Sequence, residues 1–137
     1  MAGGVPVNKI TRLNGLKFDS LGSGINGQSV KALAVYGGQL YAAGIFTLAG
    51  NVPVKNIARW NGANWDSVGG GTDNQIWDLQ VYNGELYATG YFTKAGSVSS
   101  NSMAKWNGLN WSAVSGGING IGVTMKVYQN ELYVAGN

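Results

Sequence analysis

The chain of 137 residues contains no cysteine and no histidine. This absence excludes disulfides and thiolate nucleophiles, and it removes the commonest zinc ligands and the commonest general base. Gly-x-Ser-x-Gly, Walker and calcium-loop motifs are also missing. We therefore expect a protein that is not an enzyme and that has no catalytic residues, no metal site and no cofactor.

Charged residues are scarce as well, at 11% of the chain, which is roughly half the usual share. The net charge of +3 comes from nine basic residues spread along the sequence, so they form no stripe for phosphate contacts. No apolar run approaches the length of about 18 residues that a membrane span needs. We expect no nucleic-acid partner, no membrane partner and no signal peptide in this chain.

Glycine, by contrast, is abundant, with 23 residues, and the sequence repeats. The segment 35–44 (VYGGQLYAAG) recurs at 81–90 (VYNGELYATG) and at 127–136 (VYQNELYVAG), at intervals of 46 residues. Periods of this length are typical of architectures in which repeated units bury a shared core.

A second pattern lies between these copies. The segment 57–65 (IARWNGANW) recurs at 103–111 (MAKWNGLNW), and a degraded copy stands at 10–18 (ITRLNGLKF). Leu13 and Phe18 replace the two tryptophans in the degraded copy, so we interpret these positions as packing positions. The chain is thus one domain, 1–137, with three units: 2–47, 48–93 and 94–137.

Each unit predicts four short strands and no helix, because no segment shows a sustained 3.6-residue apolar period. In the middle copy of this four-strand pattern, which crosses from the unit 48–93 into the unit 94–137, the strands are expected at 76–82, 85–90, 103–106 and 111–114. The first two strands are joined by a two-residue turn, which favours residues that tolerate positive φ: Gly37-Gly38, Asn83-Gly84 and Gln129-Asn130. The fold class is therefore all-β, with a four-stranded antiparallel meander in each unit.

These units resemble kelch-type β-propeller repeats. The likeness rests on an apolar strand, a Gly turn into Leu-Tyr-x-x-Gly, and an apolar-Trp strand followed five residues later by a second Trp. The units are also similar to the Trp-Asn-Gly-x-x-Trp repeats of bacterial surface and secreted proteins, which implies a secreted or cell-surface parent. Kelch repeats usually carry Gly-Gly where this chain has Ala43-Gly44, Thr89-Gly90 and Ala135-Gly136. The resemblance implies a β-propeller with three four-stranded blades per chain.

Three blades are too few to close a ring, since propellers typically have four to eight. The chain starts with the third and fourth strands of one blade and ends with the first and second strands of another, so we expect a second copy to complete each split blade. Two chains would give six blades with two-fold symmetry, and three would give nine. The split also indicates an excised or engineered fragment of a longer repeat protein. The expected interface residues are Ile10, Leu13, Phe18, Leu132 and Tyr133. A monomeric β-trefoil, which also has three four-stranded repeats, is the alternative fold.

Binding residues gather on loops that a rigid scaffold displays. The loops that join one unit to the next are rich in neutral hydrogen-bonding residues. Trp77 lies near the start of an inner strand, where the other units have Lys31 and Val123, so packing alone does not demand a tryptophan there. The residues expected to contact a ligand are Trp77, Asp73, Asn74, Gln75, Asn26, Gln28 and Asn119.

Two functions are therefore open. The first is a non-enzymatic repeat scaffold that self-assembles into a symmetric β-propeller, with another copy of itself as the partner. The alternative is a lectin-like module that binds a carbohydrate or a protein through the long-loop face.

Overall fold

The computed structural model describes residues 2, 4 and 7–137, and every regular element in this part of the chain is a β-strand. The strands form antiparallel sheets from consecutive segments. None of these residues belongs to a helix long and apolar enough to cross a membrane. The predicted all-β class is therefore confirmed.

Two four-stranded meanders form the centre of the molecule. The first has the strand order β3-β4-β6-β7, with the short β5 paired to the end of β4, and the second has the order β8-β9-β12-β13. The bounds in the first sheet are β3 Ile25–Tyr36, β4 Gln39–Ala49, β5 Val52–Pro53, β6 Ile57–Trp60 and β7 Trp65–Ser67. Those in the second are β8 Ile76–Tyr82, β9 Glu85–Gly90, β12 Met103–Trp106 and β13 Trp111–Ala113.

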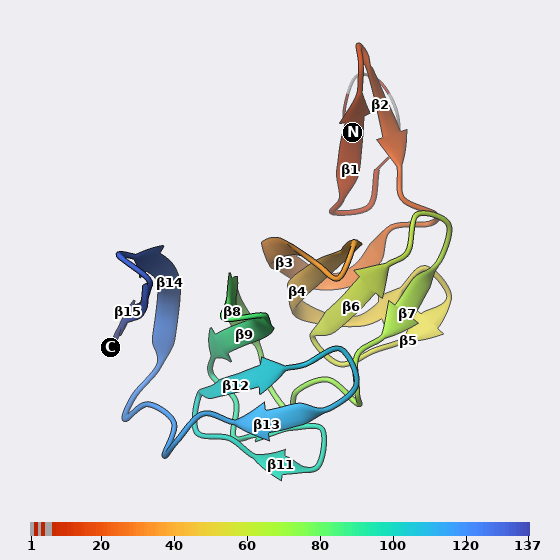
Figure 1. Ribbon diagram of the computed structural model, residues 1–137. Helices are drawn as coiled ribbons and strands as arrows, with labels where there is room; N and C mark the ends of the chain where they lie inside the picture. Colours follow the sequence, from red (N-terminus) through yellow and green to blue (C-terminus); the bar gives the residue numbers. More distant parts are fainter. Residues whose placement is uncertain (1, 3, 5–6) are drawn as a thin grey trace.

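Three hairpins accompany these sheets: β1 (Thr11–Asn14) with β2 (Lys17–Ser20), β10 (Lys94–Ala95) with β11 (Val98–Ser99), and β14 (Gly122–Tyr128) with β15 (Glu131–Gly136). The hairpin β1–β2 stands beyond the first sheet and β14–β15 beyond the second, so the two lie at opposite ends of the molecule (Figure 1). The strand β8 contacts both β3 and β14, which places the first strands of the three units next to one another.

The turns explain why the strands begin and end where they do. Both central residues of each predicted two-residue turn have positive φ, including Asn83 at 48° and Gly84 at 75°. Such turns match the twist of the flanking strands and fix the register. The turns after β6 and β12 are instead closed by Asn61 and Asn107, whose side-chain Oδ1 atoms each accept two backbone N–H groups.

The core lies between neighbouring sheets rather than on one side of each. One buried cluster joins Tyr41 and Ile57 of the first sheet to Ile76, Leu79 and Trp106 of the second. Burying side chains of this size stabilises the fold by about 1.5–3 kcal/mol each. The paired tryptophans pack ring against ring, with centroids 5.2 Å apart in the first sheet and 5.4 Å apart in the second. The sheets therefore share one interior and stabilise each other.

Three of the four strands predicted for the middle copy, β8, β9 and β12, have the predicted bounds. The fourth, β13, ends at Ala113, one residue before the predicted end. The short strands β5, β10 and β11 were not predicted, because two-residue strands carry no periodic signal. The stretch from Phe18 to Val35 is one residue longer than the equivalent stretches 65–81 and 111–127, and β3 accommodates this residue where its pairing with β4 shifts register between Gly27 and Ser29.

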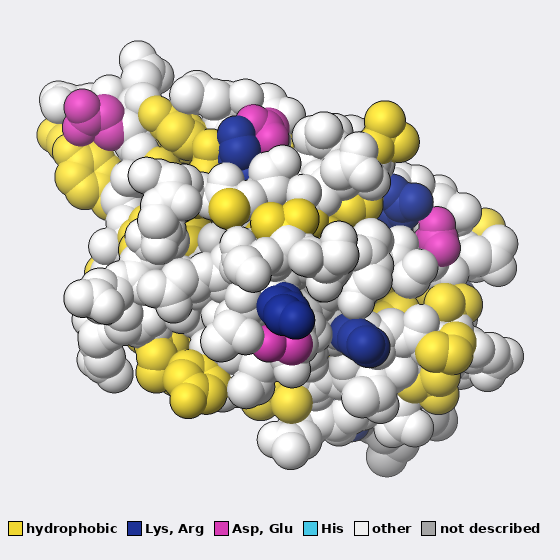
Figure 2. Space-filling view, turned by 90° about the horizontal axis from the view of Figure 1, so that it is seen from below, with side chains coloured by type: hydrophobic (Ala, Val, Ile, Leu, Met, Phe, Trp, Pro, Cys, Tyr) yellow, Lys and Arg dark blue, Asp and Glu magenta, His cyan; other side chains and the backbone are white. Residues whose placement is uncertain are grey.

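The surface is polar and sparsely charged. Figure 2 shows Lys and Arg side chains scattered singly or beside an acidic side chain, with no gathered basic patch on the face in view. Two of the ion pairs join facing strands, Arg12 with Asp19 at 3.5 Å and Arg59 with Asp66 at 3.1 Å.

Candidate functional site

The contacts between neighbouring sheets recur with the sequence repeat. The hydroxyl of Tyr36, at the end of β3, donates to the carbonyl of Gly84 at 2.8 Å. Its counterpart Tyr82, at the end of β8, donates to the carbonyl of Asn130 at 2.9 Å. The third counterpart, Tyr128, is 61% exposed. Tyr36 and Tyr82 thus hydrogen-bond to the turn that corresponds to their own in the next repeat, whereas Tyr128 makes no such bond among the described residues.

The tryptophan that begins the fourth strand of each sheet, β7 or β13, makes a second repeated contact. Trp65 Nε1 donates to the carbonyl of Leu21 at 3.0 Å, and Trp111 Nε1 donates to the carbonyl of Val68 at 3.0 Å. Both indoles are buried. The two acceptors, Leu21 and Val68, correspond to Val114 in the last copy of the repeat. The two donors correspond to Phe18 of β2 in the first copy.

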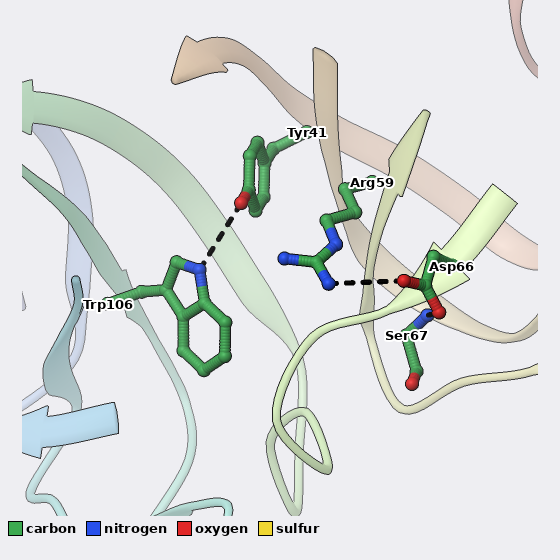
Figure 3. A network of polar contacts seen from close by, with 5 residues as sticks. All are labelled: Tyr41, Arg59, Asp66, Ser67 and Trp106. Atoms are coloured by element: carbon green, nitrogen blue, oxygen red, sulfur yellow. Dashed lines mark hydrogen bonds and ion pairs between the residues drawn. The ribbon is translucent and has the colours of Figure 1, made fainter. Parts of the chain in front are cut away.

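A polar network joins the two sheets through the strands β4, β6 and β12 (Figure 3). Trp106 Nε1 donates to the hydroxyl of Tyr41 at 3.2 Å. The Tyr41 hydroxyl stabilises the charged guanidinium of Arg59, and Asp66 does so to a smaller extent. Because these two contacts outweigh the effect of burial, the pKa of Arg59 lies above its ordinary value. The counterpart of Tyr41 in β15 is Tyr133, which is 51% exposed.

The outer face of the first sheet carries apolar side chains that are exposed, whereas the first sheet covers the equivalent face of the second sheet. Leu33 and Val35 of β3 are 53% and 68% exposed, whereas Leu79, which corresponds to Leu33, is only 5% exposed. Leu79 is covered because it packs in the cluster that includes Ala32 of β3. The face of β3 that carries Leu33 and Val35 therefore lacks the neighbour that β8 has.

The residues predicted for the interface lie at these open ends. Leu13 and Tyr133 are exposed, while Phe18 and Leu132 are half-buried. Ile10 is already buried within the chain, where it packs with Leu21, Ile25 and Trp65. In the described part of the chain, β1–β2 and β14–β15 each form only a two-stranded sheet. Unpaired strand edges of this kind are templates for pairing with another chain.

Sequence reasoning missed several residues of this surface. Nothing in the sequence indicated that three exposed residues belong to this surface, because their counterparts are ordinary core or hydrogen-bonding positions: Tyr128, Leu33 and Val35. The signal appears only when exposure is compared between equivalent positions of the three units.

Asp73 is held by the loop that precedes β10. Its carboxylate accepts hydrogen bonds from Thr93 N at 2.8 Å, Thr93 Oγ1 at 2.6 Å and Lys94 N at 2.9 Å. Burial alone would raise the pKa of Asp73, but these hydrogen bonds outweigh it and hold the pKa below its ordinary value. The carboxylate therefore joins two loops of the same unit.

The predicted ligand contacts are only partly brought together. Asp73 and Asn74 line one cavity of about 330 Å³, which lies among the loops that precede β8, follow β9 and precede β12 and β14. Asn119 lines an adjoining depression beside β15. The backbone carbonyl of Gln75 accepts a hydrogen bond from Tyr91 N at 3.0 Å. Asn26 and Gln28 are exposed on β3, in the other sheet.

Trp77 lies at an irregularity in β8, where the register with β9 shifts between Ile76 and Asp78. It is half-buried, and its Nε1 atom is enclosed without a hydrogen-bond partner among the described residues. It is not among the residues that line the cavity at Asp73. The ligand role predicted for Trp77 stays a prediction.

Among the described residues no group of three or more acidic side chains is placed to hold a metal ion. No family model matches the chain, and no curated protein matches it.

Proposed function

We propose that the chain is a non-enzymatic repeat scaffold whose activity is self-assembly into a closed β-propeller. Each four-stranded meander acts as one blade. The hairpin β1–β2 of one copy completes the blade begun by β14–β15 of a second copy. The observation that carries this proposal is the pattern of sheet contacts, each of which has an unfilled counterpart at the two ends of the molecule.

The open ends are complementary to one another. Tyr128 of one copy would donate to the carbonyl of Gly38 in the second, as Tyr36 does to Gly84 within the chain. The strand β14 would cover the exposed Leu33 and Val35 of the second copy, as β3 packs against Leu79. One docking event would therefore satisfy both polar and apolar groups.

The register of the shared blade follows from the complete ones. The strand β12 pairs with β9 so that Trp106 faces Leu86 and Lys105 faces Tyr87. The equivalent pairing of β1 with β15 of a second copy sets Leu13 against Leu132.

The same register sets Arg12 beside Tyr133 and Glu131 of the second copy. In the complete blade, Lys105 Nζ lies 2.8 Å from Glu85 Oε1, and this contact raises the pKa of Lys105. We call the pairing of β1 of one copy with β15 of the other the seam. Arg12 and Glu131 occupy the equivalent positions at the seam, so an ion pair between the two copies is expected there.

Two copies give six blades, which falls within the usual four to eight, whereas three copies give nine. The contact is the same at both seams, so two copies form a closed ring with two-fold symmetry and leave no strand edge open. A monomeric trefoil would require the three repeats to close within one chain, but β1–β2 and β14–β15 lie apart (Figure 1).

A pair of engineered cysteines tests the partner and the register together. Residues directly opposite in antiparallel strands have Cα atoms about 4.5–5.5 Å apart, within reach of a disulfide. Because the chain has no cysteine of its own, the double variant Leu13→Cys with Leu132→Cys has one defined pairing. Oxidation should give a covalent two-chain product, and the matched control, Leu16→Cys with Leu132→Cys, should not.

The other products of this oxidation are informative. A three-chain product would indicate the nine-bladed ring. A disulfide formed within one chain would contradict the proposal and favour a monomeric closure.

A further inference from the structure

The cavity beside Ser102 lies where two equivalent residues of the repeat differ. Asn56 and Ser102 are 46 residues apart and both have positive φ, 64° and 60°. Their backbones make the same bonds: Asn56 N and Ser102 N donate to the carbonyls of Phe46 and Phe92, each at 2.9 Å. The loop geometry is therefore the same in both units, and only the side chain differs.

In the first sheet the carboxamide of Asn56 spans the gap to the loop before β8. Its Nδ2 donates to the carbonyl of Thr72 at 3.1 Å and to the carbonyl of Asn74 at 3.0 Å. Its Oδ1 accepts a hydrogen bond from Phe46 N at 3.3 Å. A single side chain thus fills this junction and satisfies the polar groups around it.

In the second sheet Ser102, at the equivalent position, is too short to span the gap. The counterparts of Thr72 and Asn74 are Ile118 and Gly120, so their carbonyls lack the donor that Asn56 supplies. The space left open is the cavity of about 330 Å³, which is lined by both Ser102 and Gly120. This volume lies in the range of small-molecule sites.

The lining of the cavity favours a ligand that donates hydrogen bonds and disfavours an anion. The carboxylate of Asp73 and the main chain at Gly120 offer acceptors, and Asn74, Asn101 and Ser102 are neutral polar residues. The hydrogen bonds that lower the pKa of Asp73 keep it ionised and fixed in place. A ligand with several hydroxyl groups can donate to such acceptors.

An aromatic ring lies beside these acceptors. Tyr91 lines the cavity and is 53% exposed, and its counterpart in the first unit is the aliphatic Ile45. Exposed tyrosine rings offer an apolar face with a polar end. The apolar face of a sugar ring can pack on such a surface while its hydroxyls reach the acceptors.

We infer that the cavity between Ser102, Tyr91 and Gly120 binds a neutral pyranose sugar. The site lies within one chain, between β9 and the loop before β14, so it does not depend on the proposed assembly. Asp73 and Asn74 belong to it, whereas Tyr91 and Ser102 could not be identified from the sequence alone.

Titration of the isotope-labelled chain with glucose, galactose, mannose and N-acetylglucosamine, followed by amide NMR, tests this inference. At least one of these sugars should shift the amide signals of Tyr91, Ser102 and Gly120 at roughly millimolar concentration. The variant Ser102→Asn places a carboxamide where the first sheet has Asn56, so it should fill the cavity, keep the fold and weaken sugar binding at least tenfold.

Two further variants complete the design. Tyr91→Ala should weaken binding to a similar extent, whereas Leu109→Ala, at an exposed turn, should bind like the unmodified chain. The inference is overturned if none of the four sugars shifts these amides, if Ser102→Asn binds as tightly as the unmodified chain, or if the shifts map to another surface. Because the solution mass is measured on the same samples, loss of assembly and loss of sugar binding are separate results.

Discussion

The indole of Trp65 donates a hydrogen bond to the backbone carbonyl of Leu21, 44 residues earlier in the chain, at 3.0 Å. This bond joins the first sheet to the segment that follows β2. The equivalent bond from Trp111 to Val68 joins the second sheet to the first. A repeat chain is stabilised by such contacts between neighbours, so every unit needs another beside it.

Replacement of Trp65 by Phe should therefore lower the free energy of unfolding. The carbonyl of Leu21 would lose its buried donor, at a cost of about 1–3 kcal/mol, and Trp111→Phe should have an effect of similar size. Urea unfolding at one fixed protein concentration measures both, since assembly makes stability depend on concentration. An unfolding free energy equal to that of the unmodified chain would show that these bonds contribute nothing.

The reverse substitution, Phe18→Trp, should strengthen the assembly. In the proposed ring, Phe18 faces Val114 of the second copy, and an indole there would donate to its carbonyl as Trp111 does to Val68. A net gain of about 0.5–1.5 kcal/mol at each seam would lower the dissociation constant by up to roughly tenfold per seam. Analytical ultracentrifugation across a dilution series measures this constant. An unchanged or higher constant would place Phe18 outside the seam.

Substitutions at two leucines of the hairpin β1–β2 distinguish a residue of the assembly interface from one that is merely exposed. Leu13 lies in β1 and is 61% exposed, whereas Leu16 lies in the turn and is fully exposed. Leu13→Glu would bury an unpaired carboxylate at the seam and should raise the dissociation constant at least 100-fold, about 2.7 kcal/mol. Leu16→Glu should leave it unchanged. Equal effects of the two variants, measured by sedimentation, would contradict the shared blade.

Asp73 should give stability a pH dependence of known sign. Its pKa is lowered in the folded state, so its contribution is present above the unfolded value of about 3.9 and is lost as the pH falls through the folded value. Exposure to solvent limits this contribution to about 1 kcal/mol or less. The unmodified chain should therefore be more stable than Asp73→Asn at pH 7, and the difference should shrink below about pH 4. A difference that stays constant down to pH 3 would assign another role to the carboxylate.

The sequence predicted the strands well wherever turn chemistry limits the backbone. Asn83 and Gly84 adopt the positive φ values that a two-residue hairpin requires, and β8 and β9 begin and end as expected. The glycine that ends the Leu-Tyr-x-x-Gly motif is also explained by geometry. A side chain at Gly44 or Gly90 would overlap the backbone of the facing strand, β3 or β8.

The site was less predictable, because it depends on differences between units rather than on the repeat itself. Asn74 and Asp73 were identified from loop composition, but the cavity also depends on the short side chain of Ser102. That position became informative only because the structure shows Asn56 filling the equivalent gap. The residues predicted for the seam came from the order of the predicted strands. Tyr128 was missed because only the structure shows that its counterparts Tyr36 and Tyr82 donate hydrogen bonds to the next turn.

The solution mass of the unmodified chain, measured by light scattering on a sizing column, tests the central claim most directly. The account predicts a particle of two chains, twice the chain mass of 14.3 kDa, with a native β-sheet circular dichroism signature. A stable particle of one chain with the same signature would contradict closure by a second copy.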